Sequence, residues 1–96
     1  MPKIILKGHI IVPNEDLEAV KTALLTHIKL TKNESGNLVF KVTQDNSNRN
    51  KFHVYEEFIN QAAFEIHQQR VKQSKWGKVT SKVEKHYEIF EVNEVV

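Results

Sequence analysis

The fold of this chain is decided by the stretch Asn37-Leu-Val-Phe-Lys-Val-Thr-Gln44, which the polar turn Asn46-Ser-Asn-Arg-Asn50 separates from Lys51-Phe-His-Val-Tyr-Glu-Glu-Phe58. Two alternating segments on either side of a polar turn predict a β-hairpin. Successive side chains of a strand point to opposite faces, so one face of the second strand is apolar except for Glu56. An ionisable group there costs free energy unless it is paired, protonated or used in chemistry. Glu56 is therefore the first candidate for a functional residue.

The segment before the hairpin has a strand pattern followed by a helix pattern. Ile4 to Val12 is rich in β-branched and aliphatic residues, which predicts a strand that ends at Pro13. Apolar residues then recur at helical spacing, which predicts a helix over residues 15–32 with Asn14 as its N-cap. Gly36 lies just beyond, where a left-handed cap is favoured.

A second helical region is predicted after the hairpin, with Asn60 as its N-cap and a break near Gln69–Lys72. Alternation then predicts a last strand at His86–Val92. The order β-α-β-β-α-β is that of the ferredoxin-like fold, an α+β fold in which two helices cover one face of a four-stranded antiparallel sheet. The other face also carries apolar side chains, so we expect a second copy to cover it and form a twofold homodimer.

Length and composition exclude several classes of protein. The 96 residues suit a single domain over residues 1–96, and 40% hydrophobic residues are ordinary for a globular protein. The chain has no cysteine and no apolar run long enough to span a membrane, so a soluble cytoplasmic protein is expected. The net charge is only +2, so no nucleic-acid partner is predicted. Scattered histidines and isolated glycines predict neither a metal site nor a nucleotide cofactor.

The hairpin and the helix after it carry a family resemblance. The residues that carry it are Glu34-x-Gly36-Asn37-Leu38-x-Phe40, Asp45, Phe52-x-x-Tyr55-Glu56 and Ala62-Ala63-x-x-x-His67. In this pattern the chain resembles the antibiotic biosynthesis monooxygenase family, and most closely its small bacterial members, which include the isomerase of the phosphorylated autoinducer-2 signal. The resemblance implies a dimeric α+β barrel. It also implies an apolar cavity with a base, because some members oxygenate anthrones or hydroquinones without metal, flavin or haem.

Two departures from related proteins bear on the activity. Haem-degrading relatives use an Asn on the first strand where this chain has Gly8, and a Trp where it has His67, so haem degradation is not implied. After the second-helix His, the family commonly carries Ser-Pro-His-Phe. Here the run is Arg70-Val71-Lys72-Gln73, which lacks a second His and an aromatic residue. Any activity that depends on that second His is in doubt.

Three residues are candidates for catalysis, and each also has a structural interpretation. His67 lies on the sheet side of its helix, where it is either a general base or substrate anchor, or a buried His bonded to a carbonyl or carboxylate. Glu56 is either an acid or base of the ligand cavity or an ion-pair partner for a Lys or His. His27 lies at the edge of the apolar stripe of the first helix, and similar isomerases have a His near this position.

Four residues are candidates for substrate binding. Trp76 and Phe40 are expected in the cavity wall, although Trp76 is more simply a core residue because it shares helical spacing with Val79 and Val83. Asn37 belongs to the family motif but also suits a role in bonding turn amides. Tyr55 has the opposite parity to Glu56, so it is more simply a residue of the sheet or dimer face.

Three functions remain open from the sequence. The first is a cofactor-independent monooxygenase-like enzyme that acts on a small aromatic or quinol-type substrate. The second is an isomerase of a small phosphorylated dicarbonyl metabolite, which a basic pocket would favour and an oxygen requirement would exclude. The third is a module that binds a small ligand without catalysis.

Overall fold

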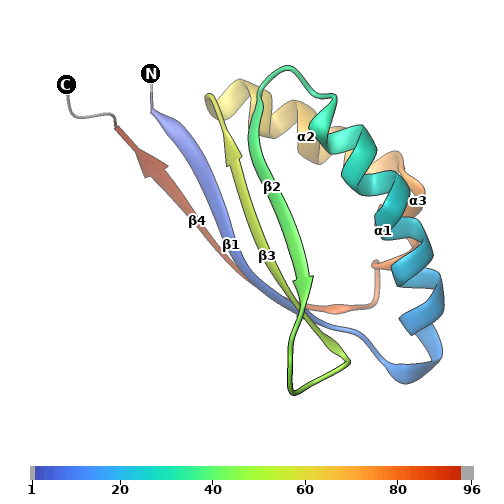
Figure 1. Ribbon diagram of the computed structural model, residues 1–96. Helices are drawn as coiled ribbons and strands as arrows, with labels where there is room; N and C mark the ends of the chain where they lie inside the picture. The colour runs from blue at the N-terminus through green and yellow to red at the C-terminus, as the bar shows by residue number, and fades with distance from the viewer. Residues whose placement is uncertain (1, 94–96) are drawn as a thin grey trace.

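The computed structural model describes residues 2–93 and has the predicted order of strands and helices (Figure 1). The elements are β1 (Lys3–Ile11), the 3₁₀ helix η1 (Asn14–Asp16), α1 (Leu17–Lys32), β2 (Asn37–Gln44), β3 (Lys51–Phe58), α2 (Gln61–Gln73), α3 (Lys75–Val79) and β4 (Glu84–Val92). The bounds of both hairpin strands are those predicted from their alternation. In the described part of the chain, none of the helices is long and apolar enough to span a bilayer.

The four strands form one antiparallel sheet in the order β2-β3-β1-β4, which is the ferredoxin-like topology. The helices lie on one side of the sheet, nearest to β2 and β3, and β4 forms the far edge (Figure 1). Nearly every residue of β4 is exposed for this reason. The opposite face of the sheet has no helix over it, as two helices in so short a chain would predict.

The strand register places Glu56 on the helix side of the sheet. Ile4 pairs with Phe58, Leu6 with Glu56, and these residues are all buried. Glu56 is only 7% exposed even though its neighbours along the same face of β3 are apolar. The predicted ionisable group inside the core is therefore confirmed.

The core has two apolar clusters. The first joins α1 and α3 to the end of the sheet where β1 finishes and β3 begins. It consists of Ile10, Val12, Leu17, Val20, Ala23, Phe52, Trp76 and Val83. The second lies under α2 and consists of Ile4, Leu6, Val54, Phe58 and Phe64. On β1 the two clusters are separated by Gly8, so the helix-side face of that strand has no side chain between Leu6 and Ile10.

The ends of the helices differ in part from the prediction. Asn14 does not cap α1, because η1 precedes the helix, and its Oδ1 instead accepts a hydrogen bond from Asn50 Nδ2 at 2.9 Å. Asn60 caps α2 as predicted, since its Oδ1 accepts a bond from the Ala63 N–H at 2.8 Å. The break in the second helical region lies at Ser74, whose Oγ accepts from the Gly77 N–H at 3.1 Å.

The predicted left-handed cap at Gly36 is wrong, and the glycine serves close packing instead. Among the described residues, the positive φ belongs to Gly8, at 157°. A Cβ on Gly36 would lie 2.3 Å from the Cβ of Ala63, so α2 can approach the α1–β2 loop only because Gly36 has no side chain. At Gly8 a Cβ would lie 1.8 Å from the backbone oxygen of His86 on β4. Both glycines therefore allow backbone approaches that another residue would block.

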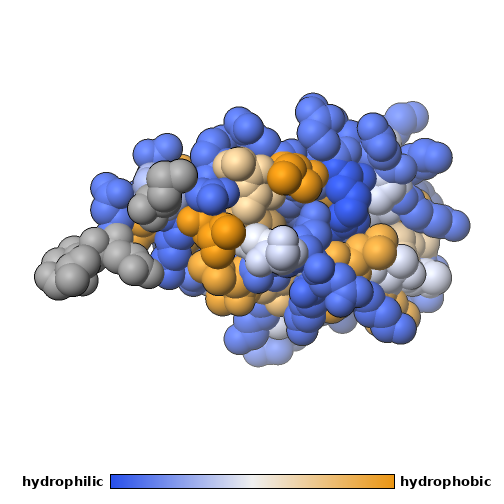
Figure 2. Space-filling model, turned by 90° about the horizontal axis from the view of Figure 1, so that it is seen from above, coloured by the Kyte–Doolittle hydropathy of each residue, from blue (hydrophilic) through white to orange (hydrophobic). Residues whose placement is uncertain are grey.

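Apolar side chains also lie on the surface at the end of the sheet where β2 begins and β3 ends. Leu38, Ile59 and Ile66 are between 44% and 67% exposed there. Seen from above, apolar side chains gather near the middle of the molecule with polar side chains around them (Figure 2). Scattered exposure of this kind is normal on a protein surface.

Candidate active site

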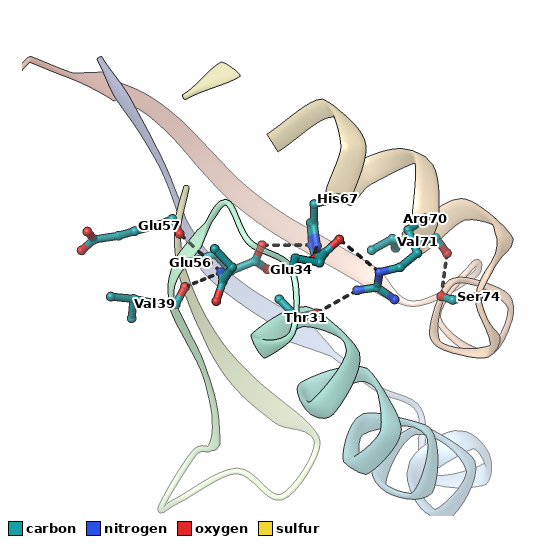
Figure 3. A network of polar contacts seen from close by, with 10 residues as sticks. Thr31, Glu34, Val39, Glu56, Glu57, His67, Arg70, Val71 and Ser74 are labelled. Carbon is teal, nitrogen blue, oxygen red and sulfur yellow. Dashed lines mark hydrogen bonds and ion pairs between the residues drawn. The ribbon is translucent and has the colours of Figure 1, made fainter. Parts of the chain in front are cut away.

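His67 lies between two carboxylates that come from different parts of the chain (Figure 3). Its Nδ1 is 2.7 Å from Glu34 Oε1, in the loop between α1 and β2, and its Nε2 is 3.4 Å from Glu56 Oε1 on β3. The His67 residue is only 2% exposed. The first contact is a short hydrogen bond, whereas the second is a longer ion-pair contact.

The two carboxylates decide the charge of His67. Burial on its own would lower the pKa of His67, but hydrogen bonding and the negative charges of Glu56 and Glu34 outweigh burial and raise that pKa. The imidazolium form of His67 therefore persists to a higher pH than that of an ordinary histidine. His67 is better suited to hold and return a proton between two carboxylates than to act as a free base.

Glu56 keeps an acceptor atom available. Its Oε1 is buried and has no hydrogen-bond partner among the described residues, although the His67 ring lies beside it. A buried carboxylate oxygen without a bonded donor is unusual in a folded protein and calls for an explanation. The nearest donor is His67 Nε2 at 3.4 Å, which carries a proton when the ring is charged.

Arg70 joins the same cluster from the next turn of α2 (Figure 3). Its Nε donates to Glu34 Oε2 at 3.1 Å, and its Nη2 donates to Thr31 Oγ1 at 2.9 Å. Sequence reasoning did not select Glu34, Arg70 or Thr31. Two signals were present: Glu34 opens the family motif, and Arg70 follows His67 by three residues, which places both on one side of a helix.

A row of rings links the two apolar clusters through this site. Ring centroids are 4.8 Å apart for Trp76 and His27, 5.9 Å for His27 and His67, 4.8 Å for His67 and Phe58, and 5.5 Å for Phe58 and Phe64. The rings of His27 and Trp76 are almost parallel, at 4°. Phe40 adds an edge contact to His27 at 5.2 Å. Trp76 and Phe40 thus pack against His27, and Trp76 belongs to the first apolar cluster, which is its core interpretation.

His27 is buried and neutral. Burial, with the nearby charges of His67 and Arg70, lowers the pKa of His27 to about 3. Its Nδ1 has no hydrogen-bond partner among the described residues. His27 and His67 therefore have opposite charge preferences although their rings are neighbours.

Two predicted substrate-binding residues have other contacts. Asn37 Nδ2 donates to the carbonyl of Val39 at 3.0 Å and to that of Glu57 at 3.3 Å, where the β2–β3 register shifts. Tyr55 lies on the open face of the sheet, and its hydroxyl donates to Glu57 Oε2 at 2.5 Å. Asn37 thus bonds backbone carbonyls at the strand irregularity, and Tyr55 is a residue of the open sheet face. Both contacts agree with the structural roles considered for these residues.

Tyr87 was not selected from the sequence but belongs near the site. It pairs with Gly8 across the sheet and shares the helix-side face with Glu56. Tyr87 is 36% exposed, and its partial burial together with the negative charge of Glu56 raises the pKa of the phenol, which keeps it protonated. In residues 2–93 no three His, Asp or Glu side chains are arranged to hold a metal ion.

Comparison with known proteins gives the family. The sequence profile described as antibiotic biosynthesis monooxygenase matches residues 4–78, which is most of the chain. The chain belongs to the antibiotic biosynthesis monooxygenase (ABM) family. None of the proteins with curated descriptions matches it.

Solved structures share the fold of this ABM domain at low sequence identity. A Bacteroides thetaiotaomicron protein of unknown function, described as a possible oxidoreductase, has a TM-score of 0.81 and 20% identity, over 94% of this chain and 97% of its own. A Deinococcus radiodurans protein, provisionally assigned as an antibiotic biosynthesis monooxygenase, has a TM-score of 0.80 and 22% identity, over 97% and 95%. A Nitrosomonas europaea protein with the same provisional assignment has a TM-score of 0.75 and 18% identity, over 100% of both chains.

The two site histidines give this ABM domain opposite dependences of stability on pH. The unfolded chain binds a proton at His27 near its ordinary pKa of 6.5, whereas the folded chain does so only near 3, so His27 lowers stability as pH falls below about 6.5. The raised pKa of His67 contributes stability that is complete below about 6.5 and is lost as pH rises through the raised value. These two contributions together favour a maximum near pH 6.5.

The variant His27→Phe isolates the acidic side of this dependence. It keeps a ring against Trp76 but has no group to protonate. As the pH falls from about 6 to about 4, the unfolding free energy of the variant should rise relative to that of the native chain by about 1.4 kcal/mol for each pH unit. Urea unfolding across this range measures the difference. A difference that does not change with pH would contradict a buried, neutral His27.

Proposed function

We propose that this ABM domain is a cofactor-independent monooxygenase-like enzyme that acts on a small aromatic or quinol-type substrate. The observation that carries the proposal is the unpartnered, buried Glu56 Oε1 beside a His67 whose other nitrogen is bonded to Glu34. Such an arrangement suits removal of a weakly acidic proton, because a positioned base next to a cation favours the anionic product.

Glu56 takes the substrate proton in this proposal. The charge of His67 stabilises both the ionised carboxylate before the transfer and the substrate anion after it. Glu34 and Arg70 hold His67 in place through the bonds described above. The row of rings from Trp76 to Phe58 makes the surroundings of His67 aromatic and apolar.

The substrate supplies the electrons for the reaction with oxygen. For an anthrone, loss of one ring proton gives a carbanion that adds O₂ at the same carbon. After reprotonation, the peroxide loses water across its O–O bond together with the second hydrogen of that carbon. The sum is CH₂ + O₂ → C=O + H₂O, so one oxygen atom enters the product and no external reductant is consumed.

An isomerase of a phosphorylated dicarbonyl compound is the second candidate. Proton transfer by Glu56 and His67 would serve it equally. The observation that favours it is the pair of basic residues, Arg70 and Lys75, beside one small cavity between α1 and the α2–α3 junction. Turnover in the absence of oxygen would select the isomerase.

The variant Glu56→Gln tests the proposed base. It keeps the size of the side chain and removes the proton acceptor, so oxygen uptake with an anthrone or hydroquinone should fall roughly 10²–10⁴-fold in kcat/KM. An oxygen electrode measures the rate. Glu65→Gln, which neutralises an exposed carboxylate on the same α2 that carries His67, should keep the native rate. Equal rates for both variants would rule out Glu56 as the base.

We also propose that the open face of the sheet forms a twofold homodimer. Phe90 on β4 is 38% exposed there, and with Ile5 and Tyr55 it lines a 320 Å³ hollow. Lys7 and Glu88 are cross-strand neighbours on the same face. A twofold axis brings the same patch of two copies together. Lys7 of one copy can then pair with Glu88 of the other, and the reverse.

Replacement of one apolar residue of this face should separate the dimer. Phe90→Glu places two carboxylates in the proposed interface, so the chain should sediment as a monomer of 11.2 kDa instead of a dimer. Leu25→Glu, at a residue of α1 that is 65% exposed, makes the same chemical change on the helix layer and should leave the dimer intact. A native chain that sediments as a monomer at micromolar concentration would refute this part of the proposal.

A further inference from the structure

Three histidines lie side by side on the open face of the sheet, away from the candidate active site. His53 on β3 and His86 on β4 are both direct cross-strand partners of His9 on β1. Their strand parity places them on the same face as Tyr55 and Phe90. These three residues thus form one histidine row across three neighbouring strands.

The contacts within the row differ from one histidine to the next. Nε2 of His53 is 2.7 Å from Asp45 Oδ1, and Nε2 of His86 is 2.7 Å from Glu84 Oε2. In the described part of the chain, His9 has no hydrogen bond to a carboxylate. Its ring stacks on that of His86, with centroids 4.7 Å apart and an angle of 25° between the planes. Like charges directly opposite each other destabilise a pair of strands, so this stack favours at least one neutral ring.

The surroundings of His9 favour its neutral form. Partial burial lowers the pKa of its imidazole, and the charges of Lys51, His86 and His53 lower it further. The negative charge of Glu84 acts in the opposite direction but does not outweigh them. These groups come from β3 and β4, the two strands that flank β1. His9 is therefore mostly uncharged at neutral pH and takes up a proton in acid.

The open face carries as many acidic as basic groups while the row is neutral. Strand parity and register place four lysines and three glutamates on it, and Asp45 reaches it through its contact with His53. The basic residues are Lys3, Lys7, Lys41 and Lys51, and the acidic residues are Asp45, Glu57, Glu84 and Glu88. Protonation of the three histidines therefore changes the described face from a net charge of zero to +3.

We propose that the histidine row makes the homodimer sensitive to pH, so that two open faces bind each other while the row is neutral and separate when it is protonated. This inference rests on the proposed homodimer. In a face-to-face dimer both rows belong to the paired surfaces, so two faces of charge +3 would have to meet. The carboxylates of each face are already matched by its lysines, which leaves the added charges without a counter-charge.

Proton linkage gives the direction of the effect. In a separated copy, His9 takes up its proton below the ordinary histidine pKa of 6.5. In the dimer it should do so at a still lower pH, because the partner's row adds positive charge and the interface excludes water. Separated copies then bind more protons than the dimer, and dissociation is favoured as pH falls. One proton for the His9 of each copy makes Kd rise roughly 10–100-fold per pH unit between about pH 6 and 5.

Sedimentation equilibrium of the full chain measures this dependence directly. Kd is determined at several values between about pH 8 and 5, with circular dichroism at each pH to verify the fold. The native chain should be a dimer at about pH 8 and should dissociate in acid with the slope given above.

The variant His9→Gln removes the central titrating group of the row, and Thr43→Gln is its matched control. Thr43 is exposed and pairs with His53, so it extends the same row without a titratable group. His9→Gln should reduce the slope of log Kd against pH by about half or more. Thr43→Gln should keep the native slope even if Kd itself changes. The triple variant His9→Gln, His53→Gln and His86→Gln should remain a dimer at about pH 5.

The outcomes separate this inference from the homodimer on which it rests. A native chain that dimerises as tightly at about pH 5 as at about pH 8, or more tightly, would overturn the pH dependence and leave the homodimer standing. Equal slopes for the native chain and His9→Gln would overturn the role of the row. A chain that is a monomer at every pH would overturn both.

Discussion

Buried His67 lies between the carboxylates of Glu34 and Glu56, which raise its pKa, and three separate segments of the chain must converge to bring these groups together. α2 carries the ring, the α1–β2 loop carries Glu34, and β3 carries Glu56. The close approach of α2 to that loop in turn requires that Gly36 has no side chain. A buried ion pair is a poor source of stability, because desolvation removes several kcal/mol per ion. Its presence in the middle of a small core is better explained by chemistry than by stability.

The division of the core follows from the same cluster. The space between the sheet and the helices does not hold one continuous apolar core. The cluster of His67, Glu34 and Glu56 lies between the two apolar clusters. The row of rings restores contact between the two halves, since His27 stacks on Trp76 and His67 packs on Phe58. The two histidines therefore serve packing and charge together. One is favoured as the cation and the other as the neutral ring, so the interior avoids two adjacent positive imidazoles.

The sequence predicted the fold better than the site. Hairpin strands alternate over their full length, and this local signal sets both their bounds and the burial of Glu56. Asn14 and Gly36 misled because a good capping residue acts only if the helix begins or ends there, and tertiary contacts decided otherwise. His67 and Glu56 could be paired by face and family motif. Glu34 and Arg70 were not selected, although Glu34 opens the family motif and Arg70 lies on the same side of α2 as His67, because neither shows a periodicity that predicts burial.

The departure from the family run has a physical counterpart at Arg70. Where relatives commonly carry Ser-Pro-His-Phe, this chain lacks the second His, and the arginine in the first of these positions bonds to Glu34 and Thr31. One titratable ring is thus missing, and a permanent cation stands beside the remaining His.

The charge state of His67 is the central claim, and NMR of the imidazole nitrogens tests it most directly. In long-range ¹H–¹⁵N spectra of the uniformly labelled chain recorded across neutral pH, the nitrogens of His67 should titrate with a midpoint above the ordinary 6.5, while His27 should show one protonated and one unprotonated nitrogen throughout. A midpoint for His67 at or below 6.5 would contradict the account, because Glu56 and Glu34 would then not favour the cation and the proposed proton transfer would lose its electrostatic support.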